Sequence, residues 1–158
     1  MPTDSKKTAN KNSPSRHQLL EKQIKFQLSE LSATNSHHEF EHICRKITKA
    51  RICSNIMPST GPVSGGGDKG RDFQTYKTYL KKEVGESTFL SLISDSLLVF
   101  ACSIGATKIP QKIKKDVETI CINGTAVQGI HFFTSHNLQA AKRFELQAWA
   151  KKNIRRRS

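Results

Sequence analysis

Two acidic residues, a glycine-rich loop and a lysine-rich segment are the first features of this sequence that could carry chemistry. Glu41 falls in a stretch with helical spacing of apolar residues, and Asp72 lies between the loop and a stretch that favours a β-strand. Magnesium prefers hard oxygen ligands and keeps several waters, so a phosphodiester-cleaving site needs carboxylates at a strand mouth and a cation near the attacked phosphate. Asp72 is the natural first ligand of such a site.

A second motif, His38-Glu39-Phe40-Glu41-His42, satisfies the H-E-x-x-H pattern, in which two histidines bind zinc and the glutamate acts as a base. At 100° per residue, His38 and His42 fall opposite Phe40, which belongs to an apolar stripe that must face the core. We therefore expect both histidines to be exposed. A zinc peptidase is kept as a remote alternative.

The loop from Gly61 to Gly70 is not a Walker A loop, because Lys69 is followed by glycine rather than by Ser or Thr, and a strand rather than a helix comes next. Two interpretations stay open. The glycines form a plain surface loop, or they bring the acids Asp68 and Asp72 together with basic residues directly before a strand.

The composition points to a basic protein with a polyanionic partner. The chain has 158 residues, 26 Lys+Arg against 13 Asp+Glu, and a formal net charge of +13, which favours nucleic acid as the partner. No apolar run reaches the length of a membrane span, and no secretory signal opens the chain. The four cysteines stand singly, as expected for reduced thiols of a cytoplasmic protein.

Hydrophobic spacing and turn residues divide the chain into a disordered basic tail over 1–16, one α/β domain over 17–150 and a basic tail over 151–158. The order of elements implies a sheet flanked by helices, with a crossover helix between the last two strands. The predicted helices cover 18–31, 36–47, 87–94, 110–120 and 138–148; the predicted strands cover 71–80, 96–104 and 129–135; and 56–70 is predicted to be a loop.

Finer predictions concern caps and buried faces. Ser36 and Glu39 have the spacing of a capping box at the start of the second helix. The buried stripe of that helix is predicted to be Phe40, Ile43, Cys44 and Ile47. The strand over 129–135 is expected to be buried, and the last helix is expected to bury Leu138, Ala141, Phe144 and Ala148.

Taken together, the segments FEHICRKI, STGPVSGGGDKGRD, LLVFACS and KIKKDVETI resemble the restriction-endonuclease-like PD-(D/E)xK superfamily. More narrowly, they resemble the N-terminal nuclease modules of bacterial antiviral and NTPase-linked defence proteins. The resemblance covers about residues 38–150, and its most specific part is the run T-G-P-x-x-G-G-G-D-x-G-R-D. It implies a mixed central sheet flanked by helices, and hydrolysis of DNA with Mg²⁺, or Mn²⁺ in its place. It further implies that Asp72 is a metal ligand and that Glu41 assists metal binding.

The sequence departs from the family pattern at the third motif. Ala101-Cys102-Ser103 stands where an acid-x-Lys pair is expected, so the second carboxylate and the strand lysine are both missing. One hypothesis is that the lysine has moved to the following helix, with Lys112 best placed and Lys108 next. Lys112 would then orient the attacking water or stabilise the phosphorane charge. In the alternatives the module is inactive and only binds nucleic acid, or Lys112 is an ordinary solvated charge.

The resemblance also indicates the partners. Double-stranded DNA bound with little sequence preference is the expected substrate, since the charge surplus gives non-specific affinity for phosphates. Asp68 is a weaker candidate for the site than Asp72. Because the chain ends in a basic helix where one further strand would be expected, we expect a larger partner or parent protein, such as one that carries an NTPase.

Overall fold

The computed structural model describes residues 14–59, 70–77, 93–105, 107–122 and 127–154. Their centre is a mixed four-stranded sheet in the order β1-β2-β3-β4, formed by Ile56–Pro58, Phe73–Thr75, Leu98–Ser103 and Gly129–Thr134. The first three strands are antiparallel, and β4 runs parallel to β3. The predicted class, an α/β fold with a mixed sheet flanked by helices, is confirmed at this level.

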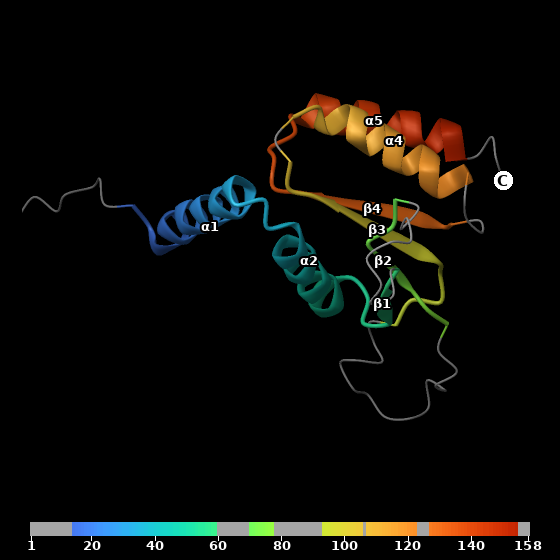
Figure 1. Ribbon diagram of the computed structural model, residues 1–158, viewed down its shortest axis with the longest axis horizontal. Helices are drawn as coiled ribbons and strands as arrows, with labels where there is room; N and C mark the ends of the chain where they lie inside the picture. The colour runs from blue at the N-terminus through green and yellow to red at the C-terminus, as the bar shows by residue number, and fades with distance from the viewer. Residues whose placement is uncertain (1–13, 60–69, 78–92, 106, 123–126, 155–158) are drawn as a thin grey trace, which may run out of the picture.

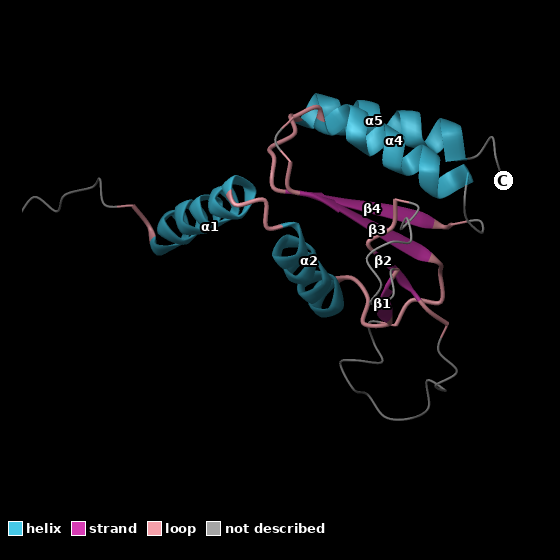
Figure 2. Cartoon of the chain, viewed as in Figure 1, coloured by secondary structure: helices cyan, strands magenta, loops and turns pink. Residues whose placement is uncertain are grey.

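Helices cover both faces of the sheet (Figures 1 and 2). The crossover helix α4 (Ile109–Ile122) and the final helix α5 (Ala140–Ile154) lie together on one side. Helix α2 (His37–Arg51) packs on the other side, where its Phe40 and Cys44 join a buried cluster with Phe100 of β3. Side chains alternate along a strand, so neighbours of Phe100 in β3 face the α4 side.

Aromatic stacking fixes the register between β2 and β3. Phe73 and Phe100 are fully buried and directly paired, and their ring centroids lie 4.9 Å apart with an interplanar angle of 11°. Phe133 of β4 stacks on both rings at longer distance. Such pairs add stability beyond the area they bury. The stack lies directly beside Asp72, so it also fixes where that carboxylate meets β3.

Helix α2 buries a narrower stripe than the sequence predicts. Phe40, Cys44 and Thr48 are buried, whereas Ile43 and Ile47 are 38% and 46% exposed. The buried residues therefore recur every four positions, along the side of α2 that contacts β3. The predicted capping box is also wrong, because the Ser36 side chain makes no capping hydrogen bond.

Helix α1 (Arg16–Ala33) begins inside the predicted tail, with a capping box between Ser15 and Gln18. It projects away from the sheet (Figure 1) and has no buried residue. Its C-terminal end touches the rest of the protein, since Leu31 packs on the core cluster and the Ser32 hydroxyl donates to the carbonyl of Ile104 at 3.0 Å. No helix in the described ranges has the length and apolarity that a bilayer crossing requires.

The strands differ from the predictions in three places. The short strand β1 lies within the predicted loop. Of the predicted strand over 71–80, β2 covers 73–75, and residues 78–80 lie outside the described residues. Every residue of β4 is only partly buried, because β4 is an outer strand of this sheet. Of the predicted short helix, residues 87–92 lie outside the described residues, and the two that follow are not helical.

The last helix lies where the sequence predicts it, but it buries a different face from the predicted one. α5 reaches Ile154, so the predicted basic tail from 151 begins inside the helix. Leu146 of α5 is buried, at 5% exposed, whereas Phe144 is 69% exposed. The helix is therefore rotated relative to the predicted face, and Leu146 packs where Phe144 was expected.

Candidate functional site

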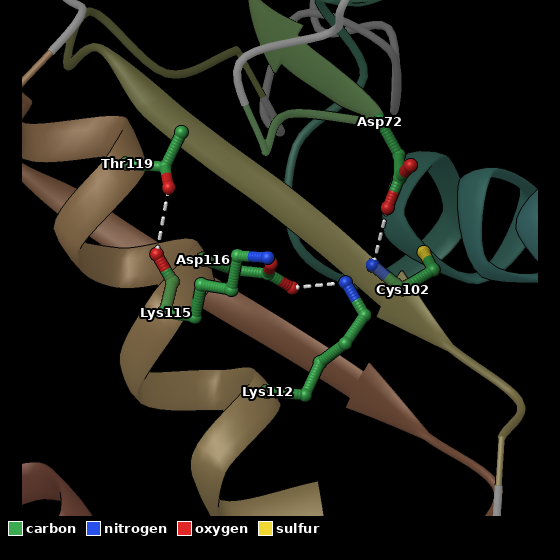
Figure 3. Close-up of polar contacts among 6 residues, drawn as sticks. All are labelled: Asp72, Cys102, Lys112, Lys115, Asp116 and Thr119. Atoms are coloured by element: carbon green, nitrogen blue, oxygen red, sulfur yellow. Dashed lines mark hydrogen bonds and ion pairs between the residues drawn. The ribbon is translucent and has the colours of Figure 1, made fainter.

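Asp72 is held at the junction of three strands. Its N–H donates to the carbonyl of Phe100 at 3.0 Å, and its own carbonyl accepts from the N–H of Ser59 at 3.0 Å. Its carboxylate oxygen Oδ2 accepts the backbone N–H of Cys102 (Figure 3). The register between β2 and β3 ends with the pair of Phe73 and Phe100, and beyond it the carboxylate serves as the acceptor for the N–H of Cys102.

The two residues before Asp72 dock the end of the glycine-rich loop on α4. Gly70 has φ +77°, and a Cβ at this position would lie 3.3 Å from the carbonyl oxygen of Asp116. Arg71 is 8% exposed, and its guanidinium donates to the Ile120 carbonyl at 3.3 Å and to Gln74 Oε1 at 3.0 Å. The G-R-D run therefore has a physical explanation: glycine permits the close approach, arginine anchors the segment to α4, and the aspartate reaches β3.

This docking creates a pocket of about 220 Å³ between the G-R-D segment, β3 and α4. Asp72 and Lys112, two of the predicted site residues, both line it. Lys112 Nζ lies 2.7 Å from Asp116 Oδ2, and the side chains are 49% and 10% exposed respectively (Figure 3). The lining residues are Gly70, Asp72, Cys102, Lys112, Lys115, Asp116 and Thr119.

Two lysines border the pocket on the α4 side. Lys112 and Lys115 are exposed and follow i, i+3 spacing, which places them along one side of the helix. Lys108, the second candidate for the moved lysine, is exposed directly before the helix begins and does not line the pocket. Lys114 lies elsewhere, with its ammonium 5.5 Å from the ring centroid of Trp149 in α5. Lys114 therefore packs over an aromatic ring and does not line the pocket.

Glu41 lies on the α2 side of β3 and does not line the pocket. Its side chain is 22% exposed, with one carboxylate oxygen 3.9 Å from Arg45 Nε. A hydrogen bond with Cys44 raises the pKa of the Cys102 thiol, and burial together with the nearby Cys44, Asp72 and Glu41 raises it further. Glu41 and Asp72 thus both act electrostatically on Cys102, although Glu41 does not line the pocket that contains Asp72.

Asp116 is the residue that the sequence reasoning missed. It is buried in α4, pairs with Lys112 and lines the same pocket as Asp72. A pair of carboxylates suits magnesium, which often takes one or two protein carboxylates and completes its shell with waters and substrate phosphates. A full protein cage is not formed, because no three His, Cys, Asp or Glu side chains gather to hold a metal in the described part of the chain.

The two histidines of the H-E-x-x-H pattern do not line the pocket. His38 and His42 are exposed on α2, as expected from the helical phase. Asp68 lies outside the described residues. The four cysteines are free thiols, and Cys44 and Cys53 are buried.

Comparisons with protein-family models, curated proteins and solved structures each find no match to this chain. The resemblance to nucleases therefore rests on the residues quoted for it. Function has to be argued from the geometry of the pocket and from the charge around it.

Proposed function

We propose that this chain is a metal-dependent nuclease module that hydrolyses phosphodiester bonds in DNA at the pocket containing Asp72 and Lys112. One observation carries the proposal: a carboxylate before β2 and a lysine of α4, far apart in sequence, line one pocket beside a second carboxylate, Asp116. Carboxylates with a cation beside them are what the hydrolysis of a phosphodiester requires.

In this proposal each residue has a defined task. Asp72 and Asp116 hold Mg²⁺, or Mn²⁺ in its place, and the ion when bound supplies Lewis-acid stabilisation of the phosphate charge. Lys112 leaves its ion pair with Asp116 when substrate and metal enter, and its ammonium then faces the charge that develops on the phosphate. Asp72 is fixed by its hydrogen bond to Cys102, so it needs no rearrangement to serve as a ligand.

The surroundings of the pocket suit a nucleic acid. Lys112 and Lys115 offer positive charge beside the carboxylates, and the whole chain carries a net charge of +13. Contacts of this kind bind phosphates rather than base edges, which supports double-stranded DNA bound with little sequence preference. A role beside an NTPase in bacterial cytoplasmic defence belongs to the same proposal and rests on the resemblance alone.

A catalytically inactive module that binds nucleic acid is the second candidate. The observation that favours it is the ion pair itself, because Lys112 and Asp116 satisfy each other at 2.7 Å. Strand β3 also carries no acid or lysine at its pocket end, where Ala101, Cys102 and Ser103 stand. Such a module would bind DNA and never cleave it.

A cleavage assay separates the two. Supercoiled plasmid with Mg²⁺ should be nicked by the parent protein and not by Asp116→Asn, which keeps the size of the side chain and removes its charge. Asp95→Asn, an exposed acid outside the pocket, is the matched control and should cleave normally. DNA binding without nicking by the purified parent protein, in either Mg²⁺ or Mn²⁺, would favour the inactive module.

A further inference from the structure

The outer edge of β4 is open in the described part of the chain. There β4 pairs with β3 alone, so the N–H and C=O groups on its other side have no partner strand. The strand reads Gly-Ile-His-Phe-Phe-Thr, without the proline, lysine or bulge that commonly protects such an edge. All six residues are partly exposed. An edge of this kind is a template on which another strand can pair.

A large groove lies between α5 and the face of β4 that turns toward the helices. It has a volume of about 660 Å³; α5 contributes Leu146 and Ala150 to its lining, and α4 also contributes to it. Ile130, Phe132 and Thr134 line the groove on the strand side. His131 and Phe133 point to the opposite face of the sheet, where their rings stack on Phe100. The groove therefore offers a contact at every second residue of β4, roughly every 6–7 Å, which is the side-chain repeat of an extended peptide.

Helix α5 gives the groove a charge. Arg143 and Lys151 line the groove, and Lys142 and Lys152 are their neighbours in sequence. The helix contains one acidic residue, Glu145. Lys142 and Glu145 pair with each other at 2.6 Å, so they largely cancel. The charges left on the groove wall are positive. A partner with acidic residues would thus be attracted, and a basic one repelled.

We propose that the groove between β4 and α5 binds an extended, acidic segment of a partner protein, which adds to the sheet as a strand beside β4. Backbone hydrogen bonds along the edge supply affinity, and alternate apolar side chains enter the groove over Ile130 and Phe132. Carboxylates that flank the apolar stretch meet Arg143 and Lys151.

Charge disfavours a second copy of this chain as the occupant. Its own β4 contains no acidic residue, and pairing of two β4 strands would bring two basic α5 helices toward each other. A small molecule could fill part of the groove but would leave the backbone edge unpaired. An extended peptide with acidic residues can pair with the edge of β4, contact the apolar groove and be attracted by the positive charges of α5.

The test uses a defined probe, the peptide fluorescein-Asp-Asp-Val-Thr-Val-Thr-Val-Asp-Asp-amide, with binding to the full chain followed by fluorescence anisotropy. We expect saturable binding that weakens at least tenfold when the aspartates become lysines. It should weaken as strongly when alternate backbone nitrogens are methylated, in at least one of the two possible registers, because methylation removes the donors that face β4.

Variants of the protein locate the site. Ala150→Trp fills the groove and should weaken the peptide at least tenfold, and Arg143→Glu should do the same through charge. Phe144→Ala, which removes an exposed ring of α5 that does not line the groove, should bind normally. Circular dichroism checks that each variant is folded, and the binding comparison uses folded variants alone.

Three results would overturn the proposal. One is the absence of saturable binding. Another is binding that ignores both N-methylation and Ala150→Trp, which would indicate surface charge alone. The third is a dimer in analytical ultracentrifugation that Ala150→Trp disrupts, which would assign the groove to a second copy. None of these measurements includes DNA or metal, so they do not depend on nuclease activity.

Discussion

The Asp72 carboxylate accepts the backbone N–H of Cys102, so the first candidate metal ligand also completes the hydrogen bonding between β2 and β3. The Asp72 carboxylate thus has a structural role and a proposed chemical role. The structural task needs an oxygen acceptor, whereas the chemical task needs a negative charge. Two substitutions at this position can separate them.

Asp72→Asn should abolish magnesium-dependent cleavage while leaving the fold intact, because the amide oxygen can still accept from Cys102 but carries no charge. Asp72→Ala should abolish cleavage and also destabilise the protein by about 1–3 kcal/mol, since the N–H of Cys102 loses its acceptor. Urea unfolding and a nicking assay on both variants provide the comparison. Normal cleavage by Asp72→Asn would limit Asp72 to the structural task.

Lys112→Ala should lower the turnover number by roughly a hundredfold or more with little change in DNA affinity, as expected for a group that acts on transition-state charge. Lys114→Ala should leave turnover unchanged. It should cost about 0.5–1 kcal/mol of stability, because the ammonium loses its contact with Trp149. Single-turnover cleavage and equilibrium binding are measured for each. Equal, small effects on turnover would remove Lys112 from the active site.

Gly70→Ala should destabilise the protein by about 1–2 kcal/mol, because φ +77° is unfavourable for any residue with a Cβ. The new methyl group would also press on the Asp116 carbonyl and displace the loop end from α4. Gly105→Ala is the control, since its Cβ would meet Ser103 Oγ at an ordinary 3.9 Å. Chemical denaturation measures both. A neutral Gly70→Ala would show that the G-R-D segment does not need this close approach.

Burial lowers the pKa of His131 below its ordinary value of 6.5, so the folded protein favours the neutral ring that stacks on Phe100. As pH falls through 6.5, the unfolded chain takes up this proton first. Stability should therefore fall on acidification, and the loss should level off below the folded pKa. His131→Phe keeps an aromatic ring and should remove this part of the pH dependence.

Thermal unfolding between pH 7.5 and 5 tests this prediction. His38→Ala, which removes an exposed histidine, serves as the control and should follow the parent protein. An unchanged pH profile in His131→Phe would place the titrating group elsewhere.

Hydrophobic periodicity in the sequence was sufficient to place α1, α2, α4, α5, β3 and β4. It failed for β1, whose three residues end at Pro58 and carry no pattern of their own. That strand exists because β2 pairs with it, with Ile56 opposite Thr75. The face of α5 was predicted wrongly for a similar reason. Phe144 is the stronger apolar residue, but the contact with α4 and β4 falls on Leu146.

The candidate site was predictable in part. Asp72 could be found because it follows a loop and precedes a strand, and Lys112 because it borders the apolar face of its helix. Asp116 could not, because an acid four residues after a lysine resembles an ordinary surface ion pair. Its burial comes from the docking of Gly70 and Arg71 on α4, a tertiary contact that no local pattern encodes.

DNA affinity should fall steeply with salt, and Lys115→Gln should reduce that dependence. Lys115 is exposed beside the pocket and forms no ion pair with any described acid, so it is placed to neutralise a phosphate. Loss of one such contact lowers the slope of log K against log salt concentration by about 0.9.

Binding should weaken equally for two duplexes of equal length and different sequence, because phosphates carry no sequence information. Lys25→Gln, which removes a lysine paired with Glu21 at 2.6 Å on the projecting helix α1, should leave the slope unchanged. A shallow slope in the parent protein, or a strong preference for one duplex, would contradict binding through phosphates.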